Sequence, residues 1–439
     1  MSRDAANYFR VGGARDTVTV SGDLEHTLKL LVDGFFAGLL KLPTDRCLDL
    51  LRIASGAYAI DRLVRRNRST GNETGIRTLN LTFEVSDPSF WSSAHISAAV
   101  RDTLEFLTDE DWAVSFEASP SRVVEDGLQH PLGLPNGYRP NRIALYSGGL
   151  DSAGGLANQL VSMNHSYAVL TVGHQSWIRR KAADQLRELQ NKLGLPPLIH
   201  STVVTALRGG HSIRMSQQET TQRTRSLLFC ACAIAAANAL EIENIDVFEN
   251  GVGSINLPVM TGMLFGGLAT RGSHPTFLRH MSTLATAIAG SSIRFHLPFA
   301  TQTKGEMLHP LRAERLHDWL QTSRSCVHTS WRVAGKSHCG TCPACIERRQ
   351  AFAIAEIPDT DCYSTDIFTT SPRSQIDADY FRVYRDDARA WLTADARPRR
   401  RMYAHLRGTQ IPTENDDGIH ALQTRHCQEV EAVYGEVPL

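Results

Sequence analysis

The sequence predicts an α/β protein: a doubly wound parallel sheet with a metal-binding knuckle, preceded by an extra α+β domain. From residue 141 to about residue 310, apolar runs of strand length alternate with helix-length patterns, as in a parallel sheet with helices on both faces. A glycine-rich turn follows the first of these strands, and such a turn at a helix start binds anions. Four closely grouped cysteines further along indicate the knuckle. We expect three parts: 1–138, 139–352 and a C-terminal extension, 353–439.

The first part carries the patterns of regular elements but no set of residues that suggests chemistry. Its expected elements are two helices, a strand, a helix and a second strand, at 23–40, 44–64, 76–85, 91–107 and 112–118. We interpret this accessory α+β domain as a region that binds a partner or covers the active site.

The second part alternates strand and helix. The expected strands are 143–146, 167–172, 198–204, 245–248 and 293–295, and the clearest helices are 153–161, 179–193 and 227–240. Ligands bind beyond the carboxyl ends of the strands in such sheets. We therefore expect segments 147–152, 171–174 and 249–253 to surround one crevice.

Composition narrows the classes of partner. The 46 basic residues balance the 46 acidic ones, so no overall charge attracts the chain to nucleic acid or to an acidic membrane. The first residues are polar, without an apolar signal region, and no apolar run is long enough to span a bilayer. Nine cysteines without a secretion signal favour a reducing cytoplasm and metal ligation over disulfides.

The glycine-rich turn reads Ser147-Gly148-Gly149-Leu150-Asp151-Ser152. Two glycines let the backbone approach a ligand closely, and the first N–H groups of the following helix have no intrahelical acceptor. The turn is therefore a candidate phosphate site, with Asp151 orienting the turn or helping to hold Mg²⁺. The chain has no GxxxxGK[ST] or GxGxxG at this point, so kinase-like and dinucleotide-binding interpretations lose their main support. The competing interpretation is an ordinary capped turn.

Two further segments offer cations for a triphosphate. Residues 208–225 form a long polar stretch with four arginines, at positions 208, 214, 223 and 225, which reads either as a solvated loop or as a lid over phosphates. Lys304 follows the last expected strand and is either a phosphate contact or a surface lysine.

The cysteines Cys326, Cys339, Cys342 and Cys345 form the second strong signal. The last three are spaced by three residues each, and Gly340 frees the turn between them. Closely spaced thiolates of this kind hold Zn²⁺ in a tetrahedral site. His338 or His328 could replace Cys326, an iron–sulfur cluster is an alternative, and unmetallated buried cysteines are the third interpretation.

The two signals together resemble a known family. The loop is similar to the pyrophosphate loop of the N-type (PP-loop, HUP-like) ATP pyrophosphatases. With Thr303-Lys304-Gly305-Glu306 and the Cys326, Cys339–Arg348 pattern, residues 141–352 resemble 7-cyano-7-deazaguanine synthase, the QueC family. Gly173-His174-Gln175 and Arg225 also match that family's pattern. Its Tyr-Pro-Asp-Cys-Arg-Pro-Glu-Phe segment is replaced here by Ser273-His274-Pro275-Thr276-Phe277, so nitrile formation is less well supported than adenylation.

The resemblance implies a C–N ligase that uses ATP, Mg²⁺ and Zn²⁺. It would adenylate a 7-deazaguanine carboxylate, release AMP and pyrophosphate, and form an amide or nitrile or transfer the product to a protein amine. The implied catalytic residues are Asp151, Lys304 and Arg225. The implied nucleotide contacts are Ser147, Gly148, Gly149, Leu150, Asp151, Ser152, Thr171, His174 and Arg348.

Long members of this family with extra ends occur in anti-phage defence operons, and the chain most resembles those QatC-like proteins. Their setting implies a protein partner from the same operon. Two alternatives remain: a PP-loop enzyme that modifies tRNA, which the neutral charge disfavours, and a non-catalytic, zinc-stabilised module that binds a partner.

Overall fold

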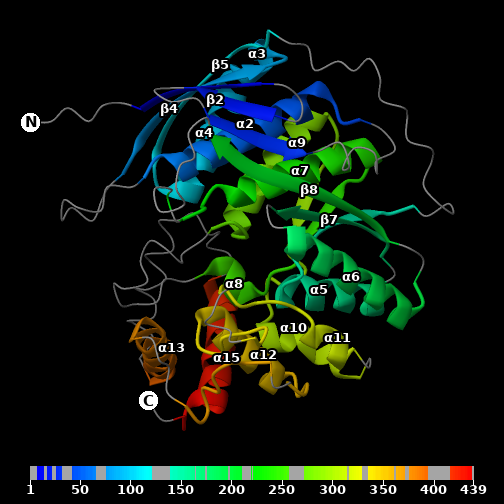
Figure 1. The fold of residues 1–439 in the computed structure, drawn as a ribbon, viewed down its shortest axis with the longest axis vertical. Coiled ribbons are helices and arrows are strands. Elements are labelled where there is room, and N and C mark those ends of the chain that lie inside the picture. The colour runs from blue at the N-terminus through cyan, green and yellow to red at the C-terminus, as the bar shows by residue number, and fades with distance from the viewer. Residues whose placement is uncertain are drawn as a thin grey trace, which may run out of the picture.

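In the computed structural model, the described residues are 7–13, 17–21, 26–31, 42–65, 76–120, 139–163, 165–173, 176–195, 198–209, 219, 221–256, 271–313, 316–328, 335–359, 362–370, 375–393 and 416–437. Their architecture is an α/β fold with one large twisted sheet and helices on both faces (Figure 1).

The sheet has ten described strands in the order β10-β9-β6-β7-β8-β3-β2-β1-β4-β5. Their bounds are β1 Asn7–Gly12, β2 Thr17–Ser21, β3 His26–Leu31, β4 Thr78–Val85, β5 Asp111–Ala118, β6 Arg142–Leu145, β7 Tyr167–Gly173, β8 Ile199–Gly209, β9 Asn244–Val247 and β10 Arg294–His296. Strands β10, β9, β6, β7 and β8 pair in parallel. This half of the sheet confirms the expected doubly wound arrangement.

The N-terminal strands extend the same sheet. Strands β8, β3, β2 and β1 pair antiparallel, and β1, β4 and β5 pair in parallel. The expected helix over 23–40 is wrong at 26–31, where the chain forms β3. Leu28 pairs with Val18 on one side and with Leu207 on the other, because two neighbouring strand edges together outweigh local helical periodicity.

Two helical layers cover the sheet. The described helices are α2 Asp45–Leu63, α3 Pro88–Trp91, α4 Ala94–Thr108, α5 Leu150–Ser162, α6 Ser176–Leu193, α7 Arg225–Leu240, α8 Gly251–Ile255, α9 Pro275–Ala289, α10 Lys304–Leu308, the 3₁₀ helix η3 His309–Arg312, α11 His317–Gln321, α12 Pro343–Ile354, α13 Gln375–Thr393 and α15 Asp416–Tyr434. Ile143 faces the layer of α2, α4, α7 and α9, whereas Ala144 faces the layer of α5, α6 and α10–α12. Successive residues of a strand point to opposite faces, so β6 contributes to both cores.

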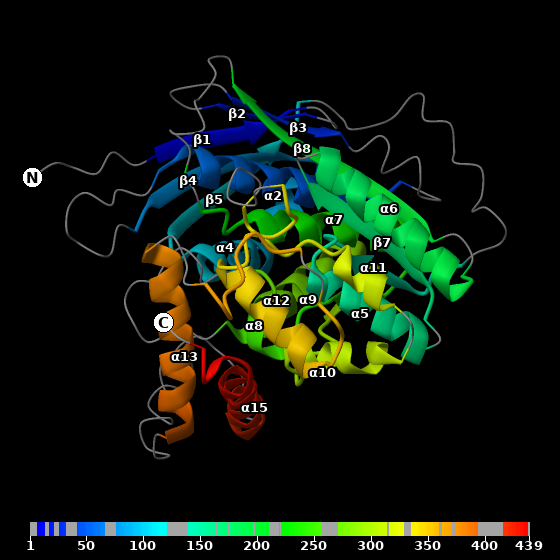
Figure 2. The ribbon, with the colours of Figure 1, turned by 60° about the horizontal axis from the view of Figure 1, so that its bottom comes forward.

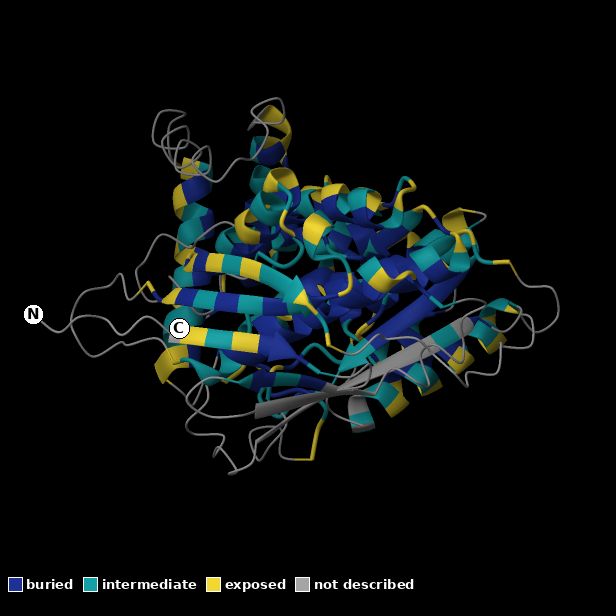
Figure 3. Cartoon of the chain, turned by 90° about the horizontal axis from the view of Figure 1, so that it is seen from above, coloured by how far each residue is buried: buried dark blue, intermediate teal, exposed yellow. Residues whose placement is uncertain are grey.

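Burial follows this alternation. Strand β4 buries every second residue from Leu79 to Val85, seen as alternating buried and intermediate bands (Figure 3). Helix α7 is apolar on nearly all sides, with Ala233 and Ile234 fully buried, as expected for a helix enclosed by the core.

The N-terminal region is tied to this central helix by a buried polar junction. Asp61 of α2 is fully buried, forms an ion pair with Arg77 at 2.7 Å, and accepts hydrogen bonds from the backbone N–H and the hydroxyl of Thr224, the N-cap of α7. The division at residue 138 stays a prediction, but the sheet and this junction run across it.

The C-terminal helices form a third cluster. Phe381, Trp391 and Tyr434 of α13 and α15 pack with Ile346 of α12. The two helices lie side by side at one margin of the molecule (Figure 2), and Arg389 of α13 pairs with Glu431 of α15 at 2.9 Å. Among the described helices, none is both long enough and apolar enough to cross a bilayer.

Candidate active site

The glycine-rich turn lies where β6 ends and α5 begins. Gly148 has φ +76°, in the left-handed region that a side chain disfavours. Gly149 is the N-cap of α5, and Asp151 lies in the first turn of that helix. The first N–H groups of α5 therefore open next to the turn, at the place where the sequence predicts an anion site.

The two serines hold the turn in shape. The Ser147 and Ser152 hydroxyls are 3.1 Å apart, the Ser147 N–H donates to Ser152 Oγ, and the Gly149 N–H donates to Ser147 Oγ. From outside the turn, the Arg324 N–H donates to the Gly148 carbonyl at 2.9 Å. The turn is therefore preorganised by its own hydroxyls and by one contact from the segment that follows α11.

Asp151 belongs to a cluster in which one lysine faces three carboxylates. Lys304 Nζ lies 3.0 Å from Asp151 Oδ2 and 2.9 Å from Glu347 Oε2. The Asn250 amide donates to Asp151 Oδ1 and to Glu249 Oε1, at 2.9 Å each. These residues come from α5, α10, α12 and the segment after β9, so the fold joins four separate parts of the chain here.

Burial and neighbouring charges both shift the pKa values of the groups in this cluster. Burial raises the pKa of Glu249 well above its usual value, and the nearby Asp151 charge raises it further. Burial by itself lowers the pKa of Lys304, but the carboxylates of Asp151, Glu347 and Glu249 outweigh it and hold that pKa well above its usual range. Lys304 therefore stays charged, and its single ammonium group faces three carboxyl groups.

A cavity of about 290 Å³ opens beside the turn. Its polar side includes Ser147, Asp151, Glu249 and Ser273. Its apolar side is formed by Leu145, Leu170, Val172, Phe229, Cys230, Val247 and Phe248. Burial raises the pKa of the Cys230 thiol, so this cysteine is a small apolar wall residue, as expected, rather than a nucleophile. The cavity therefore combines an apolar wall with a polar end at the glycine-rich turn.

Two further residues that the sequence places at the pocket are Thr171 and His174. Thr171 is buried, and its hydroxyl lies 2.9 Å from His200 Nε2, whereas its strand neighbours Leu170 and Val172 line the cavity. Alternation along β7 directs Thr171 to the opposite face, so its side chain does not reach the cavity. His174 lies outside the described residues.

The described arginines of the expected lid lie in different parts of the structure. Position 208 lies in strand β8, which is longer than expected because it pairs with β3, and position 214 is outside the described residues. The Arg223 guanidinium donates to the Thr108 carbonyl at 2.6 Å, so it binds α4. Arg225 begins α7 at the rim, stacked over Phe229 at 5.6 Å. Of the four, Arg225 is the one that the described structure brings next to the cavity wall.

Arg348 was expected to direct its charge at the ligand, and the structure corrects this geometry. Its side chain is fully buried, and its guanidinium donates to the Ser323 hydroxyl at 2.7 Å and to the Ser323 and Gln321 carbonyls. Ser323 immediately precedes Arg324, whose N–H holds Gly148. Arg348 satisfies the carbonyls of the segment before Arg324, which need donors. It therefore supports the glycine-rich turn indirectly, through Arg324.

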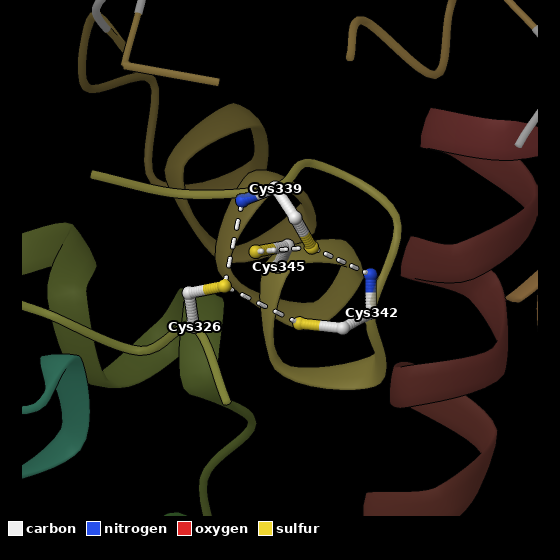
Figure 4. A group of neighbouring side chains, drawn as sticks. All are labelled: Cys326, Cys339, Cys342 and Cys345. Atoms are coloured by element: carbon white, nitrogen blue, oxygen red, sulfur yellow. Dashed lines mark hydrogen bonds between the residues drawn. The ribbon is translucent and has the colours of Figure 1, made fainter. Parts of the chain in front are cut away.

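The four cysteines converge as the spacing predicts (Figure 4). Their Sγ atoms all lie within 4.8 Å of one another, and all four residues are buried. Cys339 Sγ lies 3.8 Å from Cys345 Sγ, and Cys342 Sγ lies 4.0 Å from Cys326 Sγ. Tetrahedral Zn²⁺ with Zn–S bonds of about 2.3 Å requires sulfur separations of about 3.8 Å.

The surroundings of these cysteines also fit a metal. The backbone N–H groups of Cys339 and Cys342 donate to sulfur at 3.4 and 3.3 Å, which stabilises thiolates. Gly340 has φ +90°, and a Cβ there would lie 1.9 Å from the Thr365 carbonyl oxygen. His338 accepts from the Ser325 N–H through Nε2, so it supports the knuckle while Cys326 completes the ligand set.

The knuckle and the lysine cluster share one helix. Cys342 is the N-cap of α12, and Cys345 lies in its first turn. Glu347 follows within the same helix and binds Lys304. A metal at the cysteines would therefore fix the start of α12 and, through it, the carboxylate that faces Lys304.

Sequence reasoning did not single out Asn250 or the role of Glu347. Asn250 lies within the expected crevice segment 249–253 and Glu347 within the Cys339–Arg348 pattern, yet neither has a motif of its own. A polar pair at the carboxyl end of β9 was the available signal for Glu249 and Asn250, because strand ends at this edge of a parallel sheet meet.

The fold and the site define the class: an α/β protein consistent with a PP-loop, HUP-like fold, with a four-cysteine cluster that could bind a metal such as zinc. Residues 272–356 match the family described as Queuosine biosynthesis protein QueC. The chain is 26% identical over 238 residues to a 7-cyano-7-deazaguanine synthase of Ruegeria sp. (strain TM1040), covering 51% of this chain and 92% of that protein. It is 25% identical over 237 residues to the synthase of Ruegeria pomeroyi, covering 51% and 94%.

A third synthase, from Anaeromyxobacter sp. (strain Fw109-5), is 29% identical over 144 residues, which is 32% of this chain and 54% of that protein. The chain is thus QueC-like at modest identity. The matched family segment includes Lys304, the cysteine cluster and α12, and ends before α13 and α15.

Proposed function

We propose that this protein is an ATP-dependent ligase that adenylates a 7-deazaguanine carboxylate, releasing pyrophosphate and then AMP as a C–N bond forms. The observation that carries the proposal is the preorganised turn at the end of β6, which opens beside a cavity with an apolar wall and the Lys304 cluster. The similarity to 7-cyano-7-deazaguanine synthases supports the choice of substrate.

The chemistry needs activation because a carboxylate has no leaving group that an amine can displace. A carboxylate oxygen attacks the α-phosphorus of ATP, and the bond to the bridging oxygen of pyrophosphate breaks. The amine then attacks the acyl carbon and expels AMP, and the amine proton leaves to solvent or to a neighbouring base. Each step transfers negative charge to a leaving phosphate, so preorganised donors contribute most.

The chain's own groups divide this work. The N–H groups at the start of α5 and the Ser147 hydroxyl would hold the leaving pyrophosphate. Lys304 supplies a fixed positive charge beside Asp151, and Arg225 supplies another over the cavity-wall residue Phe229. The apolar wall with Phe229 and Phe248 suits a planar base.

Two ions would complete the site. Asp151 and Glu249 offer hard oxygen ligands for Mg²⁺, which neutralises phosphate charge. Four buried cysteine sulfurs suit Zn²⁺, and a four-thiolate site is structural, because it leaves no open position. Thiolate ligands also favour the reducing cytoplasm as the place of action.

A second part of the proposal concerns the amine that accepts the activated carboxylate. We propose a protein amine, supplied by a partner from the same operon in a QatC-like anti-phage setting. One observation supports a change from the synthase pattern: Ser273, in the segment that departs from it, lies on the cavity wall, and His274 is used as the N-cap of α9. A different segment at the cavity suits a different second half-reaction.

The test is product analysis with the full chain, ATP, Mg²⁺ and 7-carboxy-7-deazaguanine. We expect AMP and pyrophosphate, and Asp151→Asn should lower the rate about 100-fold or more, as loss of a group acting in the transition state does. Asp184→Asn, an exposed aspartate of α6, is the matched control. ADP as the main product, or AMP formation that does not depend on the carboxylate, would contradict the proposal.

A further inference from the structure

The C-terminal helix α15 lies against the segment that carries Lys304. Thr303 is the N-cap of α10, and it forms a capping box with Glu306: the Thr303 hydroxyl accepts from the Glu306 N–H, and the Glu306 carboxylate accepts from the Thr303 N–H. Helix α10 has only five residues. Such a short helix is set largely by its cap and its packing.

Both halves of this capping box are bound by α15. The Thr303 hydroxyl donates to Glu429 Oε1, and Arg425 donates to Glu306 at 2.6 Å and to the Thr301 carbonyl at 2.7 Å. Glu429 is 8% exposed, and it also accepts from the Gln350 amide of α12 at 3.1 Å. One buried carboxylate thus bridges α10 and α12.

This bridge spans the two helices whose side chains pair in the candidate active site. Lys304 follows Thr303 directly, and Glu347 lies one helical turn before Gln350. The distance between α10 and α12 therefore sets the 2.9 Å contact of Lys304 with Glu347. The two helices pack closely at Gly305, because a Cβ there would lie 2.5 Å from Ile354 of α12 and 3.4 Å from Glu429.

The same helix supports the other side of the cluster. A Cβ on Gly251, which follows Asn250, would lie 2.7 Å from Leu422 of α15 and 2.2 Å from the Ala300 carbonyl. Gly251 also donates its N–H to the Gln302 carbonyl at 2.8 Å. The views of the fold show α8, α10, α12 and α15 together (Figures 1 and 2).

We propose that Glu429, assisted by Arg425, is a positioning residue for Lys304, so that the C-terminal extension completes the candidate active site from outside the matched family segment. This inference rests on the proposed function for its activity test. The extension then serves as a fixed support for the lysine cluster, and a chain lacking α15 would hold α10 and α12 at a variable distance.

The experiment uses the full chain with Glu429→Ala, Glu429→Gln and Arg425→Met. The matched control is Glu431→Gln, also on α15, which removes the ion pair of Glu431 with Arg389 of α13 and leaves α10 untouched. We expect Glu429→Ala to lower kcat for AMP formation about 10- to 100-fold, since a misplacement of about 1 Å has that effect, with KM for ATP unchanged. Glu429→Gln keeps one acceptor for Thr303 and should retain more activity than the alanine variant.

A second measurement does not depend on activity. Acylation of lysines by acetic anhydride, read by peptide mass spectrometry, compares Lys304 with the exposed Lys181 of α6. The rate of acylation of Lys304 relative to Lys181 should rise in Glu429→Ala and Arg425→Met, because the Lys304 ammonium loses its fixed partners. The same ratio should stay unchanged in Glu431→Gln.

The two proposals fail separately. If the wild-type chain makes no AMP, the proposed function fails, and the labelling ratio still decides on Glu429. If the wild-type chain makes AMP, and folded Glu429→Ala matches its kcat and its labelling ratio, the positioning role is refuted. A variant that only melts at a lower temperature, with both readouts unchanged below that temperature, refutes it as well.

Discussion

Replacing Lys304 by methionine should make the stability of this protein depend on pH in a characteristic way. Methionine keeps most of the apolar stem and removes the ammonium group. In the wild-type protein, Lys304 Nζ supplies a positive charge 3.0 Å from Asp151 and 2.9 Å from Glu347. Without it, Asp151, Glu249 and Glu347 face one another with no ammonium group between them.

The magnitude follows from burial. Breaking a fully buried ion pair from one side costs about 3–5 kcal/mol. The side chains here are partly wet, at 16% exposed for Lys304, 21% for Asp151 and 39% for Glu347, and water screens the remaining repulsion. We therefore expect Lys304→Met to lower the free energy of unfolding by about 2–3 kcal/mol near pH 8.

The sign of the pH dependence comes from Glu249. Its pKa is raised in the folded protein by burial and by the Asp151 charge, so the folded state binds its proton more tightly than the unfolded state. Its contribution to stability is fully present below the usual value of 4.5 and is lost as pH rises through the folded value. Without Lys304 this loss is larger, because no ammonium offsets the ionised carboxylates.

Urea unfolding followed by tryptophan fluorescence at about pH 8 and about pH 5 measures the effect. The penalty of Lys304→Met should shrink to about 1 kcal/mol or less at the lower pH, where protonation relieves the repulsion. Lys181→Met, at an exposed position of α6, is the control and should show no penalty at either pH. An equal penalty at both values would refute the electrostatic reasoning and leave packing as the cause.

Two further changes test other parts of the structure. Gly340→Ala should abolish metal binding, because its Cβ would lie 1.9 Å from the Thr365 carbonyl at φ +90°; elemental analysis that finds a full metal complement in the variant would contradict this. Asp61→Asn should lower the free energy of unfolding by about 3–5 kcal/mol, because it breaks the buried pair with Arg77 and one bond to Thr224. Urea unfolding checks this change, with Asp102→Asn on the exposed face of α4 as the control. A loss no larger than that of the control would show that this junction does not stabilise the contact between the N-terminal region and α7.

Removing residues 1–138 should destabilise the rest of the chain, although their sequence suggests a separate accessory domain. Strands β1–β5 share the sheet with β6–β10, and α2 packs on α7. The shortened chain would expose the apolar face of α7 to water. The hypothesis that these residues bind a partner is therefore better tested by surface substitutions than by truncation.

The sequence by itself determined the features that depend on neighbouring residues. The SGGLDS turn is one, because a strand, two glycines and a helix start place their own N–H groups and hydroxyls together. The three closely spaced cysteines are another, because C-x₂-C turns bring sulfur atoms into one knuckle. The alternation of apolar and polar residues also predicted β4 and β5 within two residues of their observed bounds.

Only the tertiary structure decided which distant groups face one another. At residues 26–31 the expected helix is replaced by β3, because that segment pairs with β2 on one edge and with β8 on the other. Thr171 and Arg348 have the residue types of ligand contacts, yet strand alternation and buried carbonyls direct them elsewhere. Glu429 lies 126 residues from Thr303, and no local pattern marks it. Contacts over such separations depend on how helices pack against the sheet, and that is set by the whole core rather than by any one stretch of chain.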